Sequence, residues 1–258
     1  ADALWTHARN DPLWVDAGGR SVNARLAHAV QSLLDEQLAR LLTEAHDDSG
    51  NLCLGGGTAL NSAANQSAFQ RSPFESLHLH PACGDDGTSI GAALWWWHER
   101  LGHERRPFSN AELMYSTRHH DSAVAAAVAS RRERVTAEPI AATARAAAQL
   151  LVGDEVIGWF QGASEIGPRA LGNRSILADP RLRDMREHLN LRVKHREPFR
   201  PFAPSVLAEH APEWLGLASS PFMLRVTSLR SAEVTAVVHV DGTTRPQTVK
   251  RDDNPAFH

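Results

Sequence analysis

The first half of the chain alternates between helical and extended apolar patterns. Between residues 22 and 45, leucine and valine return every three or four positions with polar residues opposite, which predicts an amphipathic helix. Residues 51–54 and 77–80 are short runs of apolar or alternating residues and predict strands. A helix is predicted after each strand, over 58–68 and 89–100. This order of elements predicts an α/β arrangement.

The second half of the chain has shorter and more mixed elements. Alanine-rich helices are predicted around 122–132 and 139–151. Strands are predicted after them, at 156–160, 222–226, 237–240 and 248–249. This half is therefore predicted to be α+β or mixed, and distinct from the first half.

Two segments lack a periodic apolar pattern. Residues 1–20 contain Asp-Pro and Gly-Gly turns and are predicted to be irregular. Residues 101–122 are polar and contain glycine and proline, which predicts a linker. Because 258 residues are enough for one large or two ordinary domains, this linker is the best candidate for a domain boundary.

Positive charge is concentrated between residues 158 and 204. Nine basic residues in this stretch stand against five acidic ones, although the whole chain has a net charge of −3. The nine are Arg169, Arg174, Arg181, Arg183, Arg186, Arg192, Lys194, Arg196 and Arg200. Glycine and proline recur between them, as expected of a pocket that holds several side chains at fixed angles. Since the planar arginine fork binds phosphate or carboxylate, the stretch predicts a site for the phosphates of a small molecule.

A solvated basic face with scattered ion pairs is the competing interpretation of this stretch. It is the better account of four arginines, because surface ion pairs are common and weak. These four are Arg181, Arg183, Arg186 and Arg192. Arg169, in contrast, follows Gly-Pro and precedes Ala-Leu-Gly, a setting that bends the backbone and orients one side chain. Arg169 is therefore favoured as a site residue.

Two short motifs in the first half are further candidate sites. Gly55, Gly56 and Gly57 lie between a predicted strand and a predicted helix, which would place backbone N–H groups against an anion. Three glycines can equally form a tight turn, so both interpretations stay open. Asp85 and Asp86 also precede a predicted helix. We expect Asp85 to bind a metal ion or nucleotide-bound magnesium, and Asp86 to cap the helix.

Composition argues against several classes of protein. No apolar run approaches the ~18 residues that span a bilayer, and charged residues interrupt the first ten positions, where a signal peptide would need an apolar core. Two cysteines, Cys53 and Cys83, do not make a disulfide framework, so a cytoplasmic location is expected. The net charge of −3 implies no global attraction to nucleic acid or to an anionic membrane.

Five motifs occur in an order that resembles a known family. They are GGGTALN at 55–61, GDDGTSIGAAL at 84–94, EIGPRALGNRSILADPR at 165–181, KHREPFRPFAP at 194–204 and HVDGTTRPQTV at 239–249. With these motifs the chain resembles the O-carbamoyltransferases of antibiotic tailoring and nodulation-factor synthesis. The resemblance covers nearly the whole sequence and is most specific at GPRALGNRS and REPFRPFAP.

The resemblance implies two domains. Residues 1–118 would form the second half of an actin/sugar-kinase/Hsp70-like ATPase domain, and residues 119–258 would form a YrdC-like α/β domain without its C-terminal end. The family's paired metal-binding histidines would lie upstream of Ala1, and an asparagine-rich strand would follow His258. We therefore expect a fragment that is inactive alone.

The resemblance also implies an activity. Enzymes of this family make carbamoyl-adenylate from carbamoyl phosphate and ATP, and then transfer the carbamoyl group to a hydroxyl of a small-molecule acceptor, such as a natural product or a sugar. ATP would be a substrate and a divalent metal, iron(II) or magnesium, a cofactor, with neither a nucleic acid nor a membrane as partner. Fixed cations would offset the repulsion between two phosphorylated substrates.

Individual residues match the motifs of this family. The predicted catalytic residues, which would hold carbamoyl phosphate and the ATP phosphates, are Arg169, Lys194 and Arg200. Further positions on the phosphate side are Arg174, Arg196 and Arg245. The residues that match the nucleotide-contacting loop of the ATPase-like domain are Gly55, Gly56, Gly57 and Asn61, and the one that matches its metal-binding aspartate is Asp85.

Three other functions share some of these features. A tRNA-modifying threonylcarbamoyl-adenylate synthase or transferase shares both folds, but GPRALGNRS and REPFRPFAP are associated with the small-molecule branch. An RNA-binding surface would interleave basic and aromatic residues, whereas aromatic residues are 6% of this chain. A regulatory ATPase-like protein would bind nucleotide and ignore carbamoyl phosphate.

Overall fold

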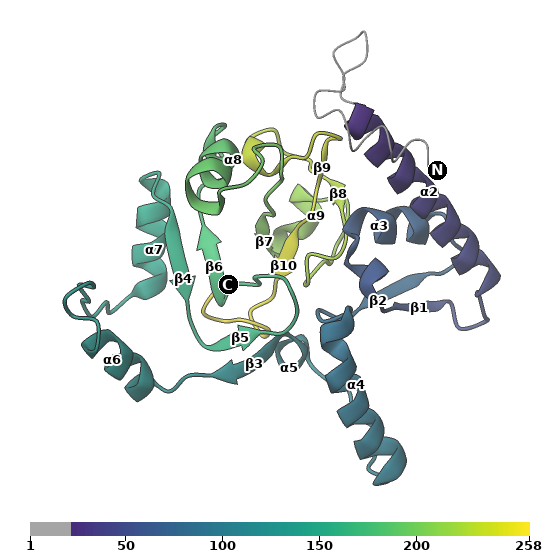
Figure 1. Cartoon of the computed structure of the whole chain (residues 1–258), viewed down its shortest axis with the longest axis horizontal. Coiled ribbons are helices and arrows are strands. Elements are labelled where there is room, and N and C mark those ends of the chain that lie inside the picture. The colour runs from purple at the N-terminus through teal and green to yellow at the C-terminus, as the bar shows by residue number, and fades with distance from the viewer. Residues whose placement is uncertain (1–21) are drawn as a thin grey trace. The chain divides into compact units, whose positions relative to one another are not determined.

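The computed structural model describes residues 22–258 (Figure 1). The segment 1–20, predicted to be irregular, lies outside the described residues. Contacts divide the chain into two compact units, one of Ala1–Cys53 with Ala63–His78 and one of Leu54–Ser62 with Leu79–His258. Each unit is described by itself, and the domain boundary at residue 118 stays a prediction.

The first unit is built on the long helix that the periodicity predicted. Helix α2 spans Val22–Glu44 and confirms that prediction. Strands β1 (Asn51–Leu54) and β2 (Ser76–Leu79) pair with each other, and helix α3 (Ser62–Gln70) lies between them in sequence. The buried apolar residues of this unit include Ala39, Leu42, Leu52, Ala64, Ala68 and Phe74. Two of these six, Ala64 and Ala68, lie in α3, so this helix buries small side chains.

The second unit begins with short helical turns. A 3₁₀ turn, η1 (Gly57–Leu60), precedes α3, and Asn61 between them is extended, so the continuous helix predicted from residue 58 is broken here. Another 3₁₀ turn, η2 (Asp85–Gly87), leads into helix α4 (Thr88–Trp95) and the π-helical turn η3 (Trp96–Arg100). Together α4 and η3 confirm the helix predicted over 89–100.

The segment predicted as a linker contains regular structure. Helix α5 (Asn110–Met114) and strand β3 (Tyr115–Arg118) both lie within it. Ser109 and Glu112 form a reciprocal capping box at the start of α5, because the Ser109 N–H donates to Glu112 Oε2 (2.9 Å) and the Glu112 N–H donates to Ser109 Oγ (3.2 Å). The prediction of an irregular linker was wrong for these residues.

The strands of the second unit pair two by two. Strand β4 (Ile157–Phe160), at the position predicted, runs antiparallel to β6 (Arg174–Leu177). Strand β5 (Ala163–Glu165) runs antiparallel to β3. Strand β7 (Ser205–Leu207) runs parallel to β10 (Gln247–Val249). Strand β10 confirms the strand predicted at 248–249. A further antiparallel pair is β8 (Thr227–Ser228) with β9 (Thr243–Thr244).

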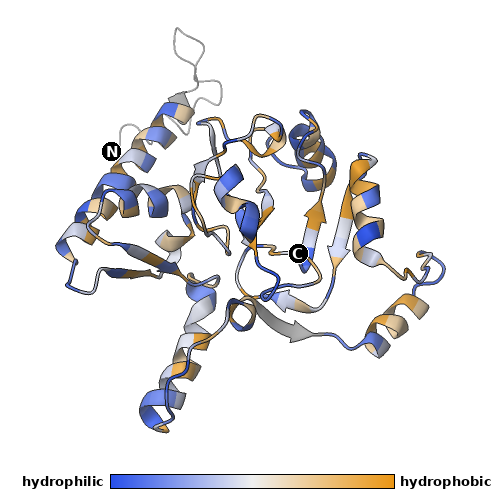
Figure 2. Cartoon of the chain, turned by 180° about the vertical axis from the view of Figure 1, so that it is seen from behind, coloured by the Kyte–Doolittle hydropathy of each residue, from blue (hydrophilic) through white to orange (hydrophobic). Residues whose placement is uncertain are grey.

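Helices of the second unit surround these strand pairs. Helices α6 (Asp121–Ala129) and α7 (Thr143–Val152) confirm the two alanine-rich helices. The short helices that follow are α8 (Met185–His188), η4 (Leu189–Lys194), η5 (Ala208–His210), α9 (Ala211–Trp214) and η6 (Thr235–Val237). Met185, Leu189 and Ala236 form a buried cluster against which Phe202 packs. Figure 2 shows hydrophobic residues on β6 and on α7, the elements that flank this region.

Two predicted strands are not formed. Residues 222–226 make a turn and a loop, because Met223 has a left-handed backbone (φ 56°) that a strand does not accommodate. Val237 lies in η6, and the residues after it continue as a turn rather than as the strand predicted over 237–240. Both apolar runs have irregular backbones. A short run of apolar residues looks the same in the sequence whether it forms a strand or an irregular segment, so the pattern could not separate the two.

The described residues form a mixed α/β structure, as the order of elements predicted. None of the helices within residues 22–258 is long and apolar enough to cross a membrane. Cys53 and Cys83 are both free thiols, which confirms that they do not form a disulfide.

Candidate active site: a cationic cavity

A glycine-supported turn presents Arg169. Gly167 has a positive φ (88°), and a Cβ atom there would overlap the carbonyl oxygen of Pro81. Gly172 also has a positive φ (101°), and a Cβ atom there would overlap the ring of Phe257. Only glycine fits two such positions without a backbone shift, so the sequence folds this turn in one way and directs Arg169 from its middle.

The guanidinium of Arg169 is partly buried and incompletely paired. Its Nη2 donates to the carbonyl oxygen of Leu60 at 3.2 Å. Its Nε is buried and has no hydrogen-bond partner among the described residues. Burial lowers the pKa of Arg169. A buried donor without an acceptor is unfavourable, and an anion in front of it would remove that penalty.

Lys194 and Arg196 are presented by an unusual helix end. The π-helical turn η4 ends at Lys194, and His195 follows with a left-handed backbone (φ 50°). Asn190, which is fully buried, then fixes the loop: its Oδ1 accepts from Arg196 Nε at 2.7 Å. Its Nδ2 donates to the carbonyl oxygens of Pro198 (3.2 Å) and Arg200 (2.8 Å). Asn190 therefore sets the path of the basic loop, and the sequence analysis did not single it out.

Arg245 lies between β9 and β10 and is the most perturbed cation of the site. Its Nε is buried without a hydrogen-bond partner among the described residues. Burial, and after it the like charges of Arg169 and Arg196, lower the pKa of Arg245 to about 10. Burial and the neighbouring Arg200 likewise lower the pKa of Arg196. The shifts show that these cations repel one another in a poorly solvated place.

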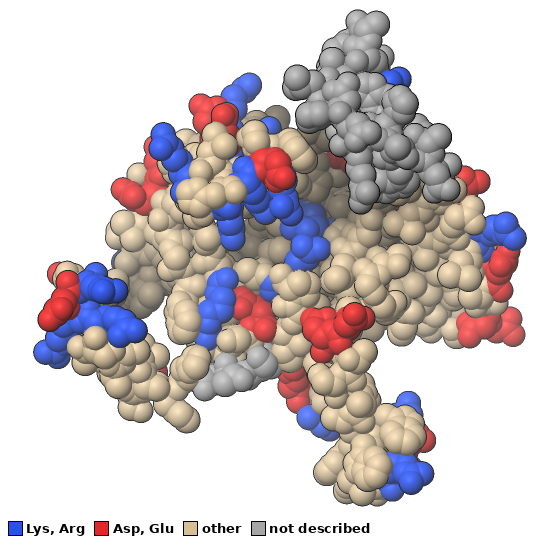
Figure 3. Space-filling view, in the orientation of Figure 1, with Lys and Arg blue, Asp and Glu red and all other residues tan. Residues whose placement is uncertain are grey.

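These four cations line one cavity of about 290 Å³. Its walls include Arg169, Lys194, Arg196 and Arg245, together with the polar side chains of Ser175 and Gln247. No described aspartate or glutamate lines it. Figure 3 shows blue Lys and Arg side chains gathered around a hollow in the face turned to the viewer. Four cations without a carboxylate make a preformed site for a multiply charged anion.

Two arginines that the sequence analysis placed with this group lie elsewhere. Arg200 is exposed, with its Nη1 3.8 Å from Glu197 Oε2, and it does not line the cavity. Arg174 donates to the carbonyl oxygens of Gln161 (2.6 Å) and Gly162 (3.2 Å), and its Cζ stands 3.5 Å from the centre of the Phe160 ring. These contacts hold Arg174 away from the cavity, which the next three residues of β6 line.

The arginines assigned to a solvated face do not join the cavity either. Arg181 is exposed and pairs with Asp179 through Nε and Nη2. Arg186 donates through Nη1 to the carbonyl oxygen of Val238 at 3.1 Å. Arg183 and Arg192 are exposed. Within the basic stretch, therefore, the structure separates the cavity cations from these four.

The glycine-rich segment 55–57 forms a turn near Arg169. Gly56 has a positive φ (90°) and donates its N–H to the Cys83 carbonyl oxygen at 2.7 Å. The segment leads into η1, a single 3₁₀ turn that ends at Leu60, whose carbonyl oxygen Arg169 contacts. Space around the Cβ positions of all three glycines is open. The tight-turn interpretation describes this backbone; a nucleotide contact by these glycines and Asn61 stays a prediction.

Asp85 is an exposed carboxylate in η2. Its carbonyl oxygen accepts from Thr88 Oγ1 at 2.6 Å. Residues 22–258 contain no group of three His, Cys, Asp or Glu side chains that could hold a metal ion. Asp85 is therefore not part of a complete metal site within the described part of the chain. Asp86 does not cap α4, because the capping position is Gly87 and no side chain bonds there, so that prediction was wrong.

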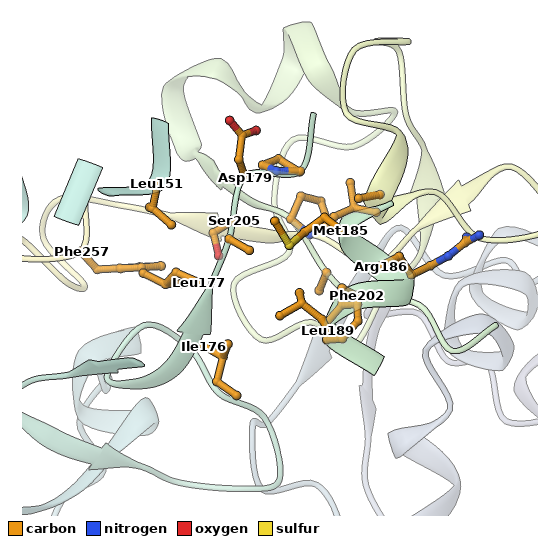
Figure 4. A pocket seen from close by; sticks show the side chains of 16 residues that line it. Leu151, Ile176, Leu177, Asp179, Met185, Arg186, Leu189, Phe202, Ser205 and Phe257 are labelled. Atoms are coloured by element: carbon orange, nitrogen blue, oxygen red, sulfur yellow. The ribbon is translucent and has the colours of Figure 1, made fainter. Parts of the chain in front are cut away.

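A second, apolar cavity of about 260 Å³ adjoins the cationic one (Figure 4). Its walls include Leu151, Met185, Leu189 and Phe257. The residues that line both cavities are Ile176, Leu177, Phe202, Ala203 and Ser205. The two cavities thus share a wall, so one ligand with a charged part and a flat apolar part could occupy both.

Two sequence models of one family match the chain. The carbamoyltransferase N-terminus matches residues 12–94, and the carbamoyltransferase C-terminus matches residues 148–258. The chain belongs to the carbamoyltransferase family. All four cavity cations lie in the part that matches the C-terminus, and the glycine-rich turn and Asp85 lie in the part that matches the N-terminus.

The chain is similar to a nodulation protein and to an O-carbamoyltransferase. Nodulation protein NolO of Bradyrhizobium diazoefficiens is 36% identical over 92% of this chain and 44% of its own length. The 3'-hydroxymethylcephem-O-carbamoyltransferase of Amycolatopsis lactamdurans is 31% identical over 96% of this chain and 46% of its own length. The chain therefore spans less than half the length of these relatives.

Proposed function

We propose that the chain is part of an O-carbamoyltransferase and that its cationic cavity binds the phosphates of carbamoyl phosphate and ATP. The observation that carries the proposal is the cluster of four cations around one cavity with no carboxylate in its wall. Buried Nε atoms of Arg169 and Arg245 without partners support an anion as the missing acceptor. Membership of the carbamoyltransferase family supports carbamoyl phosphate as that anion.

The proposed reaction has two stages. Carbamoyl phosphate and water give carbamate and phosphate; a carbamate oxygen then attacks the α-phosphorus of ATP, so that carbamoyl-adenylate forms and pyrophosphate leaves. In the second stage an acceptor hydroxyl attacks the carbamoyl carbon, its proton passes to a base, and AMP leaves with the bridging oxygen. AMP is a good leaving group, which a weak alcohol nucleophile requires.

The cavity residues would act by position and charge. Arginine forks at 169, 196 and 245 and the point charge of Lys194 would offset the charge of two phosphorylated substrates brought into one place. Arg169 and Arg196 are hydrogen-bonded to the Leu60 carbonyl oxygen and to Asn190 before any ligand arrives, so these two need little reorganisation in the transition state. The predicted role of Arg200 as a catalytic residue requires its loop to move toward the cavity, since the side chain now lies at the surface.

The apolar cavity is the proposed place for the adenine ring of ATP. It shares a wall with the cationic cavity, and Phe202 belongs to both. A flat, weakly polar base suits walls of Leu151, Met185 and Leu189, while its phosphates extend toward Arg169 and Arg245.

We further propose that the two parts of the chain have the architecture of the family. Residues 1–118 would belong to an actin-like ATPase domain and residues 119–258 to a YrdC-like domain. A divalent ion, iron(II) or magnesium, would supply Lewis-acid polarisation in the ATPase-like domain. Asp85 is one proposed ligand, and since the described residues do not complete a metal site, we derive no step through the ion.

The proposed acceptor is a hydroxyl group of a natural product or a sugar. Relatives support this class, because one is named a 3'-hydroxymethylcephem-O-carbamoyltransferase and another a nodulation protein. An RNA partner is disfavoured, because the clustered cations line a cavity of about 290 Å³ and not an extended face.

Calorimetric titration of carbamoyl phosphate into the chain, with and without a non-hydrolysable ATP analogue, tests the proposal. We expect saturable binding that Arg169→Ala and Arg245→Ala each weaken about tenfold or more, because each loses a charge-assisted contact to phosphate. Arg183→Ala, which removes an exposed arginine that lines neither cavity, is the control and should bind as the parent chain does. A folded chain that binds neither ligand would contradict the proposal.

A further inference from the structure

Glu165 is an acidic residue inside the basic stretch, yet it does not line the cationic cavity. It is the last residue of β5, which pairs with β3. One of its carboxylate oxygens, Oε1, accepts three backbone N–H groups, those of Leu171 (2.8 Å), Asn173 (2.8 Å) and Arg174 (3.0 Å). A single oxygen that gathers three main-chain donors defines the local backbone far more tightly than a surface ion pair does.

The three donors belong to the turn that carries Arg169. The start of this turn is held by β5 and by the Ile166 N–H, which donates to the Met114 carbonyl oxygen at 2.5 Å. Its end is held by Glu165 and by the Gly172 carbonyl oxygen, which accepts from Trp159 Nε1 (2.8 Å) and Gln161 Nε2 (2.7 Å). Arg169 lies midway between these two anchors. Among residues 22–258, its own side chain donates one hydrogen bond, to the Leu60 carbonyl oxygen.

We infer that Glu165 is a positioning residue that acts through this turn to hold the Arg169 guanidinium in the cavity. The inference rests on the proposed function, since it assigns Glu165 to the phosphate site. Glu165 does not need to touch the substrate: its oxygen is occupied by backbone donors, so its negative charge is directed at the turn and not into the cavity. An error of about 1 Å in such a supporting contact weakens a site substantially.

A double-mutant cycle separates positioning from a general structural role. Carbamoyl phosphate is titrated by calorimetry into the parent chain, Glu165→Ala, Arg169→Ala and the double variant, at low ionic strength so that weakened binding stays measurable. We expect Glu165→Ala to weaken binding about tenfold when Arg169 is present, and less than about twofold when Arg169 is already alanine. Circular dichroism confirms that each variant is folded.

Two further variants sharpen the cycle. Glu165→Gln keeps an oxygen that can accept the three N–H groups, so it should restore most of the affinity lost in Glu165→Ala. Asp47→Ala is the matched control, because this variant also loses one negative charge and an acceptor for a backbone N–H, that of Ser49, at a residue that does not line the cavity. Should Glu165→Ala fail to fold, the cycle is run with Glu165→Gln. Its smaller loss of affinity for carbamoyl phosphate should again be seen when Arg169 is present and disappear when Arg169 is alanine.

The outcomes distinguish this inference from the proposed function. Effects of Glu165 and Arg169 that simply add would overturn the positioning role, and so would an equal loss of affinity in Asp47→Ala. Binding that depends on Arg169 but not on Glu165 removes the inference and leaves the proposed function standing. A parent chain that does not bind carbamoyl phosphate removes both.

Discussion

At the scale of single residues, the burial of the charged Arg245 guanidinium beside other cations lowers the stability of the ligand-free chain. Burial and two neighbouring arginines lower its pKa to about 10, below the usual value for arginine. As the pH rises through about 10, the folded chain releases this proton before the unfolded chain does, so this group makes stability rise with pH there. At neutral pH the residue is protonated in both states, and its burial is a constant penalty that an anion would relieve.

This penalty predicts opposite effects of one substitution on stability and on binding. Arg245→Met should stabilise the ligand-free chain by about 1 kcal/mol, because an apolar side chain of similar length replaces a buried, unpaired cation. It should also abolish the rise in melting temperature that pyrophosphate gives the parent chain. Thermal unfolding with and without pyrophosphate measures both effects.

Arg251→Met is the matched control for this experiment, since Arg251 is exposed and lies outside the cavity. It should change neither the melting temperature nor the response to pyrophosphate. A ligand-free Arg245→Met variant less stable than the parent chain would show that Arg245 supports the fold.

The sequence named the cavity cations in advance because each lies in a distinctive motif. Arg169, Lys194, Arg196 and Arg245 come together in the structure as one wall. Their supports were not predicted: Asn190 has no pattern of its own, and Glu165 in a basic stretch is indistinguishable from a surface ion-pair partner. Which arginines face the cavity depends on backbone contacts, such as those that hold Arg174, and on the left-handed His195, and neither follows from the spacing of charges.

At the scale of elements, helix α5 depends on the capping box of Ser109 and Glu112. Hydrogen bonds from Arg106, and after it from Ser109, lower the pKa of Glu112 to about 2. The folded chain therefore binds the Glu112 proton less readily than the unfolded chain, whose value is near 4.5. Its contribution to stability is present above pH 4.5 and is lost as the pH falls toward 2.

Glu112→Gln should consequently lower the melting temperature at pH 7 and have a shrinking effect as the pH is reduced from about 4.5 to about 2. Melting temperatures of the parent chain and the variant across this range provide the comparison. Glu104→Gln, which changes an exposed residue of the same segment, controls for the loss of charge. A constant difference between the parent chain and Glu112→Gln at all pH values would contradict the assignment.

Long periodic elements were predictable and short apolar runs were not. Helix α2 was predictable because its apolar residues recur at regular spacing over many turns. The run at 222–226 resembles a strand, but Met223 turns left-handed, lines the cationic cavity, and accepts from Ser62 Oγ at 3.2 Å through its carbonyl oxygen. The Ser-x-x-Glu signal at 109–112 was present in the sequence, so α5 is an element that closer inspection for capping boxes would have found.

At the scale of the whole molecule, a net charge of −3 coexists with a concentrated cationic cavity. Long-range attraction to anions is therefore weak, and affinity for phosphate arises locally. Pyrophosphate affinity should fall steeply as ionic strength rises from 10 to 200 mM, whereas adenosine, proposed for the apolar cavity, should bind with little dependence on salt. Titrations of both ligands at several salt concentrations compare the two slopes.

In Arg245→Ala the slope for pyrophosphate should become shallower, because one cation fewer is screened. Equal salt dependence for pyrophosphate and adenosine would mean that the cationic cavity is not where the phosphate binds.

The close approach of Gly167 to Pro81 has a consequence for how this chain can vary over evolutionary time. These positions lie 86 residues apart, one in the part that matches the carbamoyltransferase N-terminus and one in the part that matches the C-terminus. Any side chain at 167 would collide with backbone atoms, which a compensating side-chain substitution at 81 cannot remove. The backbone at 81, in one part, therefore requires glycine at 167, in the other. A recombinant chain that takes one part from a distant homologue would have to keep both the backbone path at 81 and the glycine at 167.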